Sequence, residues 1–151
     1  MSDYTSETAQ PLPPAAPQPL SPADERTWAM LAHLSVLLNL FTAVGGIAGA
    51  LIIYLVYKDR SRYVAYQSLQ SLIMQGILWM GGSVIAGVFW AATSILSALI
   101  IGVVCVPLAC IVSLLPVVSI VYGIVGGIKC YQGADFQYWL IGNWVRSTLT
   151  G

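Results

Sequence analysis

The stretch YKDRSRYVAYQSLQS, residues 57–71, holds three of the chain's six Lys and Arg residues within five positions. Long apolar stretches flank it on both sides. Basic loops of membrane proteins stay on the cytoplasmic side and orient the helices that they join. The stretch therefore predicts a cytoplasmic link between two transmembrane helices, and the rest of the topology follows from it.

The overall composition indicates a membrane protein. Of 151 residues, 58% are hydrophobic and 8% are charged, whereas a soluble domain is about 25% charged. The net charge is zero and there is no basic tail, so nucleic acid is not an expected partner. The three cysteines lack a CxxC spacing and lie in apolar sequence, so neither a disulfide framework nor a metal site is expected. No cofactor is expected either.

Residues 1–21 are predicted to be a disordered, proline-rich cytoplasmic tail. Six of the eight prolines lie in the first 24 residues, which contain no basic residue. A solvated tail is favoured over a docking motif, because such compositions produce PxxP patterns by chance. Ser21, Pro22 and Asp24 then form a capping pattern that predicts the start of the first helix.

Four apolar segments follow, at residues 27–41, 47–57, 63–90 and 95–130. The first two are shorter than the ~20 residues that a full span needs, so they predict a short, tilted or partly re-entrant hairpin. The last run is too long for one span and contains Pro107 and Pro116. Residues 94–106 either extend a neighbouring helix or form a segment of their own.

The charges favour four crossings over five. All six basic residues lie before the first segment, between the second and third, or from position 129 onward. Four crossings place them on one face with both termini cytoplasmic, whereas a fifth would move Lys129 and Arg146 across the membrane. The predicted fold is therefore an all-α integral membrane protein. It has a four-transmembrane-helix bundle over residues 22–133 and an interfacial C-terminal segment over residues 134–151.

The polar residues within the segments predict packing more than chemistry. His33 is the only histidine, and no acidic residue lies in any segment to exchange a proton with it, so a hydrogen-bonded packing role is favoured over proton handling. Gln67, Ser71 and Gln75 repeat every four residues and predict a polar line that faces other helices, or less favourably a passage. No nucleophile, base and acid occur together, so an enzyme is not expected.

Small residues also recur at four-residue spacing. Gly45 with Gly49, Ser83 with Gly87, and Gly123 with Gly127 are candidates for close helix packing. Homodimerisation is the alternative use of such pairs.

The basic link is also a candidate interaction surface. Lys58, Arg60 and Arg62, with Tyr66 and Gln67 behind them, lie where anionic headgroups and cytoplasmic partners are both within reach. A purely topological role is the alternative, since positive loops are needed for orientation in any case.

Three stretches carry a family resemblance: ERTWAMLAHLSVLL at 25–38, GGIAGALIIYLVYKDRSRYVAYQSLQSL at 45–72 and GIKCYQG at 127–133. They resemble a widespread bacterial family of small four-helix membrane proteins of unknown function. That family is related to the small membrane subunit of the protein translocon in the chloroplast inner envelope. Gln67 stands where family members commonly have histidine, and Ala50 where they often have proline. The resemblance implies a four-helix fold in a bacterial inner (plasma) membrane.

Two classes of function follow. The favoured one is a non-enzymatic interaction or assembly subunit, whose partners are the lipid bilayer and other membrane proteins or further copies of the chain. The alternative is an oligomeric channel or translocon-like component, which the role of the chloroplast relative in protein import implies.

Overall fold

The computed structural model describes residues 18–99 and 101–150, and every regular element in these ranges is a helix. The elements are α1 (Pro22–Leu34), the 3₁₀-helix η1 (Ser35–Leu38), α2 (Asn39–Thr42), α3 (Gly45–Tyr57), α4 (Arg62–Met74), the π-helix η2 (Gln75–Gly81), α5 (Gly82–Ser97), α6 (Gly102–Val112), α7 (Leu115–Tyr131) and α8 (Gly142–Thr150). The predicted all-α class is confirmed for these residues. Most of the predicted disordered tail, residues 1–17, lies outside them.

The start of α1 follows the predicted capping pattern. Ser21 Oγ accepts a hydrogen bond from the Asp24 backbone N–H at 3.2 Å and donates one to the Asp24 carboxylate at 2.7 Å. Pro22 occupies the first helical position, where its missing N–H has no bond to lose. Local sequence is therefore enough to begin this helix.

The first hairpin is short. α1 continues through η1 and α2, the chain reverses around Ala43, and α3 returns. The helix tightens to 3₁₀ at Ser35, whose hydroxyl oxygen lies 2.8 Å from the carbonyl oxygens of Ala32 and Gly46. The 13 residues of α3 rise only about 20 Å, less than the ~30 Å hydrocarbon core of a bilayer.

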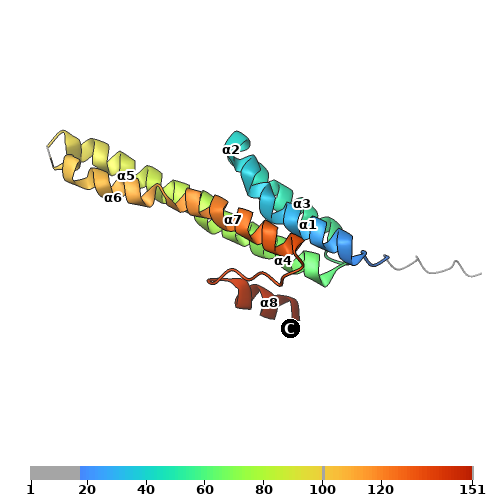
Figure 1. Ribbon diagram of the computed structural model, residues 1–151. Helices are drawn as coiled ribbons and strands as arrows, with labels where there is room; N and C mark the ends of the chain where they lie inside the picture. The colour runs from blue at the N-terminus through green and yellow to red at the C-terminus, as the bar shows by residue number, and fades with distance from the viewer. Residues whose placement is uncertain (1–17, 100, 151) are drawn as a thin grey trace, which may run out of the picture.

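The second hairpin is much longer. α4, η2 and α5 form one continuous helix of 36 residues, and α6 with α7 forms another of 30 residues. At 1.5 Å per residue these helices are about 54 and 45 Å long. Figure 1 shows them running side by side well beyond the first hairpin. The turn between Ser97 and Gly102 falls within residues 94–106, so that stretch is divided between the two helices.

Two helices, and not the four predicted, are long and apolar enough to cross a membrane. α3 is apolar but short, and α1 begins with the charged residues Asp24, Glu25 and Arg26. In the most apolar windows of the two long helices only 17% and 11% of the residues are buried. The core helix of a soluble protein would be mostly buried, so these apolar surfaces indicate association with a membrane.

The π-helix η2 lies where the long helix leaves the first hairpin. A π-helical turn contains more residues than an α-helical turn, so the residues after η2 are rotated about the helix axis. Before η2, Gln67 and Ser71 face α1 and the segment after α7, whereas after it the buried positions of α5 are Gly82, Ala86 and Thr93. A Cβ on Gly82 would lie 2.8 Å from Leu115 at the start of α7. One helix therefore serves two different packing partners.

Glycines bring α7 against the end of α1. A Cβ on Gly123 would lie 2.5 Å from Val36 Cγ1, and one on Gly127 would lie 3.0 Å from Leu34 Cγ. A Cβ on Gly49 would lie 3.1 Å from that of Ser35. These three predicted positions all lie at close contacts between elements.

Gly45 differs from the predicted helix packing. A Cβ there would meet the Thr42 side chain of its own turn, because Gly45 is the first residue of α3. A Cβ on Gly46 would lie 2.4 Å from the Ser35 carbonyl oxygen, and one on Gly126 would lie 2.9 Å from His33 Nδ1. Neither was singled out by the four-residue spacing.

A glycine also ends α7 and turns the chain back. Gly133 has φ 79°, and the Ala134 N–H bonds the Lys129 carbonyl at 3.0 Å, the pattern of a Schellman cap. Residues 134–141, called the strap below, then lead into α8, which lies beside α4 (Figure 1).

Replacing Gly123 by Leu should force α7 away from α1 and destabilise the protein by about 1–3 kcal/mol, the usual cost of overpacking. Melting of the detergent-solubilised protein, followed by circular dichroism, measures the effect. Gly87→Leu is the matched control, because a Cβ there meets no neighbouring atom within 4 Å among the described residues. Equal melting temperatures for the two variants would contradict the packing.

Candidate functional site

One face of α4 and of the first residue of η2 carries polar side chains into the interior of the protein. Gln67, Ser71 and Gln75 repeat every four residues, Gln70 lies beside them, and all four are at most 2% exposed. The prediction that this line faces other helices is confirmed by the bonds described next. An unpaired polar group in apolar surroundings costs several kcal/mol, so each of these side chains needs a partner.

His33 of α1 connects α4 to the strap. Its ring is fully buried, with Nε2 3.0 Å from Gln67 Oε1 and Nδ1 3.0 Å from the Tyr138 hydroxyl. Gln67 Oε1 only accepts, so the partners assign the proton to Nε2 and leave Nδ1 to accept from Tyr138. Burial raises the pKa of the Tyr138 hydroxyl, which keeps that donor protonated. A neutral imidazole therefore satisfies both neighbours.

Gln70 pairs with the backbone of the strap. Its Nε2 donates to the Phe136 carbonyl at 2.9 Å, and its Oε1 accepts from the Tyr138 N–H at 2.8 Å. Gln67 Nε2 also donates to the Phe136 carbonyl, at 3.1 Å. Two glutamines of α4 thus satisfy strap backbone groups that have left helical structure.

A second group of bonds links α4 to the first hairpin. Asn39 Nδ2 donates to Gln75 Oε1 at 3.0 Å, and Asn39 Oδ1 accepts from the Gly46 N–H at 2.8 Å. Gln75 Nε2 donates to the hydroxyls of Ser35 and Ser71 at 3.2 and 3.1 Å. The buried polar network therefore joins α1, η1, α2, α3, α4 and the strap.

Aromatic rings complete the contact between His33 and the strap. The Phe136 ring meets the His33 ring edge to face with 5.4 Å between centroids. Gly126 of α7 lies against both, since a Cβ there would be 2.9 Å from His33 Nδ1 and from Phe136 Cε1. A larger residue at position 126 would displace the imidazole from its partners.

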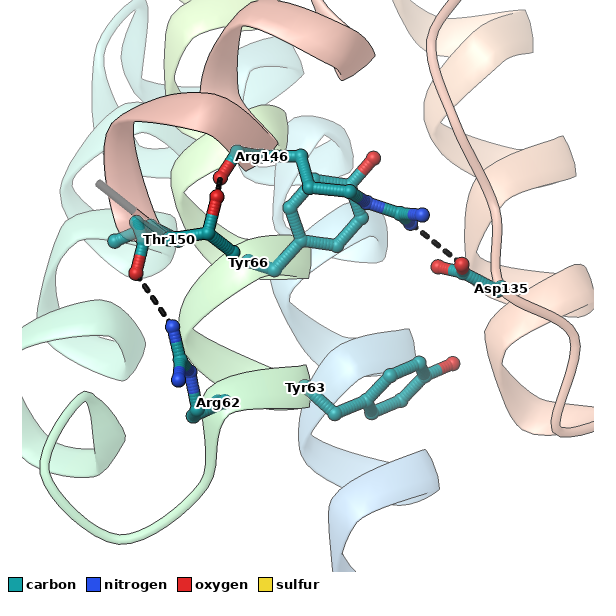
Figure 2. Close-up of a pocket in the computed structure, with 7 residues that line it drawn as sticks. Arg62, Tyr63, Tyr66, Asp135, Arg146 and Thr150 are labelled. Atoms are coloured by element: carbon teal, nitrogen blue, oxygen red, sulfur yellow. Dashed lines mark hydrogen bonds and ion pairs between the residues drawn. The ribbon is translucent and has the colours of Figure 1, made fainter.

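The structure places the five predicted interaction residues in three different surroundings. Gln67 belongs to the buried network, whereas Lys58 is exposed and Arg60 donates through Nε to the Gln18 carbonyl at 3.1 Å. Arg62 and Tyr66 line a hollow between α4 and α8 (Figure 2). The structure therefore does not place the five residues on one surface.

Several residues of the site were not identified from the sequence. Gln70 was not part of the predicted polar line, Phe136, Tyr138 and Asp135 were not assigned to a site, and Arg146 entered only through its charge. The repeated glutamines could have indicated these residues. Buried amides require hydrogen-bond partners, and the first helix has too few polar side chains to provide them. The strap supplies the rest.

The network holds amides, hydroxyls and one imidazole. Within residues 18–99 and 101–150 no group of three His, Cys, Asp or Glu side chains is placed to hold a metal ion. The chemistry that these side chains offer one another is neutral hydrogen bonding between helices.

Comparison with known proteins gives one match. The sequence model of the magnetosome magnetite crystal formation protein family matches residues 24–145. This supports the predicted resemblance to a family of small bacterial membrane proteins, and it provides no link to the chloroplast translocon subunit. No curated protein and no solved structure matches the chain.

Replacing Gln70 by Ala should loosen the strap, because the buried Tyr138 N–H is left unpaired, at a cost of about 1–3 kcal/mol. The Phe136 carbonyl then keeps only its bond from Gln67 Nε2. Limited proteolysis in detergent, with cleavage sites mapped by mass spectrometry, should show faster cutting within residues 134–141. Gln132→Ala is the control, since Gln132 is exposed. Cleavage of the strap at the same rate in both variants would show that Gln70 does not hold it.

Proposed function

We propose that this chain, which belongs to the magnetosome magnetite crystal formation protein family, is a non-enzymatic integral membrane subunit. It acts by assembling with other components of the membrane in which a magnetite crystal forms. Membership of the family supports a role in magnetite crystal formation, and the geometry of the interior supports assembly without catalysis.

The observation that carries the proposal is the self-sufficiency of the buried polar network. Among the described residues, Ser119 Oγ is the one buried side-chain nitrogen or oxygen without a hydrogen-bond partner. A catalytic site keeps polar groups available for a substrate, whereas these groups are occupied by each other. Such an interior suits a structural subunit.

The outer surface suits assembly within a membrane. α5 and α6 expose large apolar side chains along most of their length, among them Val88, Ile95, Val104 and Ile111. These surfaces require lipid tails or the apolar helices of a partner. The partners that we propose are other membrane proteins or further copies of the chain.

The alternative, an oligomeric channel or translocon-like component, needs polar groups that face a path. In the described residues the amides of α4 bond to α1, the first hairpin and the strap instead. Assembly is therefore the preferred function.

For the topology we propose four membrane segments in a bacterial inner membrane, with both termini cytoplasmic. The two long helices are the full spans, and the two segments of the first hairpin are short ones. Single cysteines replacing Asp59 and Ser147, in a chain without its three native cysteines, should react with an impermeant thiol reagent from the cytoplasmic side alone. Both positions are exposed, unlike Ser61, which is 5% exposed and donates to Glu25. Thr42→Cys, at the exposed tip of the first hairpin, should react from the opposite side. Reaction of Thr42→Cys from the cytoplasmic side would make the first hairpin re-entrant.

The role in crystal formation is tested by complementation. The chain, expressed in a magnetite-forming bacterium that lacks its own member of the family, should restore the size of the crystals seen by electron microscopy. Gly87→Leu should restore it equally, whereas Gly123→Leu should not, because its helices are forced apart. Crystals that remain those of the deletion strain, with the protein present in the membrane by immunoblot, would refute the proposed process.

A further inference from the structure

The hollow between the start of α4 and α8 lies outside the buried network and shares only Tyr66 with it. Its volume is about 260 Å³, and its lining includes Arg62, Tyr63, Tyr66, Arg146 and Leu149. Figure 2 shows Arg62 on α4 and Arg146 on α8 bordering the same space. Two arginines from distant parts of the chain therefore line one hollow, with Arg62 reaching toward the end of α8 and Arg146 toward Asp135.

Both arginines are held in place by contacts that leave some of their N–H donors unused. Arg62 Nη2 donates to the Leu149 carbonyl at 2.6 Å, and Arg146 Nη2 is paired with Asp135. The Arg146 guanidinium also lies over the Tyr66 ring, 4.7 Å from its centroid. A guanidinium has five N–H donors, so each side chain is oriented by these contacts and still has donors left for a ligand.

The charge around the hollow favours an anion. The Asp135 carboxylate raises the pKa of Arg146, so that guanidinium stays charged. A second hollow of about 180 Å³ shares Arg62 and Leu149 and adds Lys58. Among the described residues that line the two hollows, three are cations and one is a carboxylate. Arg60 is turned toward Tyr57 and the Gln18 carbonyl.

The position of the hollow corresponds to the headgroup level of a bilayer. Arg62 is the first residue of the first long apolar helix. Trp139 and Trp144, on the strap and α8, are 89% and 61% exposed, as expected of aromatic side chains at a membrane interface. Tyr63, Tyr66 and Leu149 add apolar walls that suit the glycerol region of a lipid.

We propose that this hollow binds the phosphate of one anionic phospholipid, with Arg62 and Arg146 donating to its oxygens. Paired guanidinium groups match phosphate oxygens in charge and geometry. A phosphodiester is also the anion that a membrane supplies at this level. The site does not depend on the proposed role in crystal formation.

Native mass spectrometry of the full chain in detergent tests the site. With phosphatidylglycerol the protein should retain one lipid, and with phosphatidylethanolamine, which has no net charge, it should retain less. Arg62→Gln and Arg146→Gln should each weaken retention about fivefold, the factor that one charge near the membrane surface contributes. Arg60→Gln is the matched control and should leave retention unchanged, because Arg60 is not among the residues that line the hollow.

A second variant separates the site from loss of folding. Asp135→Asn removes the one carboxylate that competes with a phosphate for Arg146, and it should strengthen lipid retention by about fivefold. A misfolded variant would not gain affinity. Unchanged or weaker retention in this variant would overturn the proposal.

The source of the phosphate is tested with soluble compounds. Glycerol 3-phosphate and inorganic phosphate have the same anionic group without acyl chains, and neither should displace the lipid at millimolar concentration. If glycerol 3-phosphate binds and phosphatidylglycerol does not, the assignment to a lipid is wrong. Equal weakening by Arg60→Gln and Arg146→Gln would reduce the site to diffuse surface charge and would equally overturn it.

Discussion

The pairing of polar groups in apolar surroundings is the constraint on which this structure depends. Gln67, Gln70 and Gln75 leave α4 on one face and find partners on α1, the first hairpin and the strap. A hydrogen bond between membrane helices contributes only about 0.6 kcal/mol on average. The penalty for leaving a buried amide unpaired is larger, at about 1–3 kcal/mol. The register of the helices therefore follows from avoiding unpaired groups more than from the strength of any one bond.

Such bonds require the helices to approach closely, and glycine makes the approach possible. Gly46 lies against the Ser35 carbonyl, and Gly126 lies against the ring of His33, so both glycines adjoin atoms of the polar network. The two features depend on each other, because a side chain at either position would separate the donors from their acceptors. Beyond η2 the network ends, and α5 packs on α6 as an apolar pair that leaves most of its surface exposed.

The strap divides the protein into a neutral interior and a charged exterior. On its inner side, His33 and the glutamines are linked by neutral hydrogen bonds. On its outer side, Arg146 pairs with Asp135 above the Tyr66 ring. Tyr66 joins the two, since its hydroxyl donates to Gln70 Oε1 at 3.2 Å while its ring lies under the guanidinium. A hydrogen-bonded interior and a charged surface are consistent with the membrane subunit that we propose.

Composition and local spacing were enough to predict the helical class, the cap at Ser21, the inward face of Gln67, Ser71 and Gln75, and the contacts of Gly123 and Gly127. Each of these depends on neighbours a few residues away or on the average polarity of a segment. The number of long apolar helices differed from the prediction, because the polar start of α1 and the shortness of α3 matter more than their apolar content. The strap and the hollow required the folded chain, since their contacts join residues as distant as His33 and Tyr138, 105 positions apart. Periodicity carries no information about which of two such distant residues will meet, because packing of the whole chain determines it.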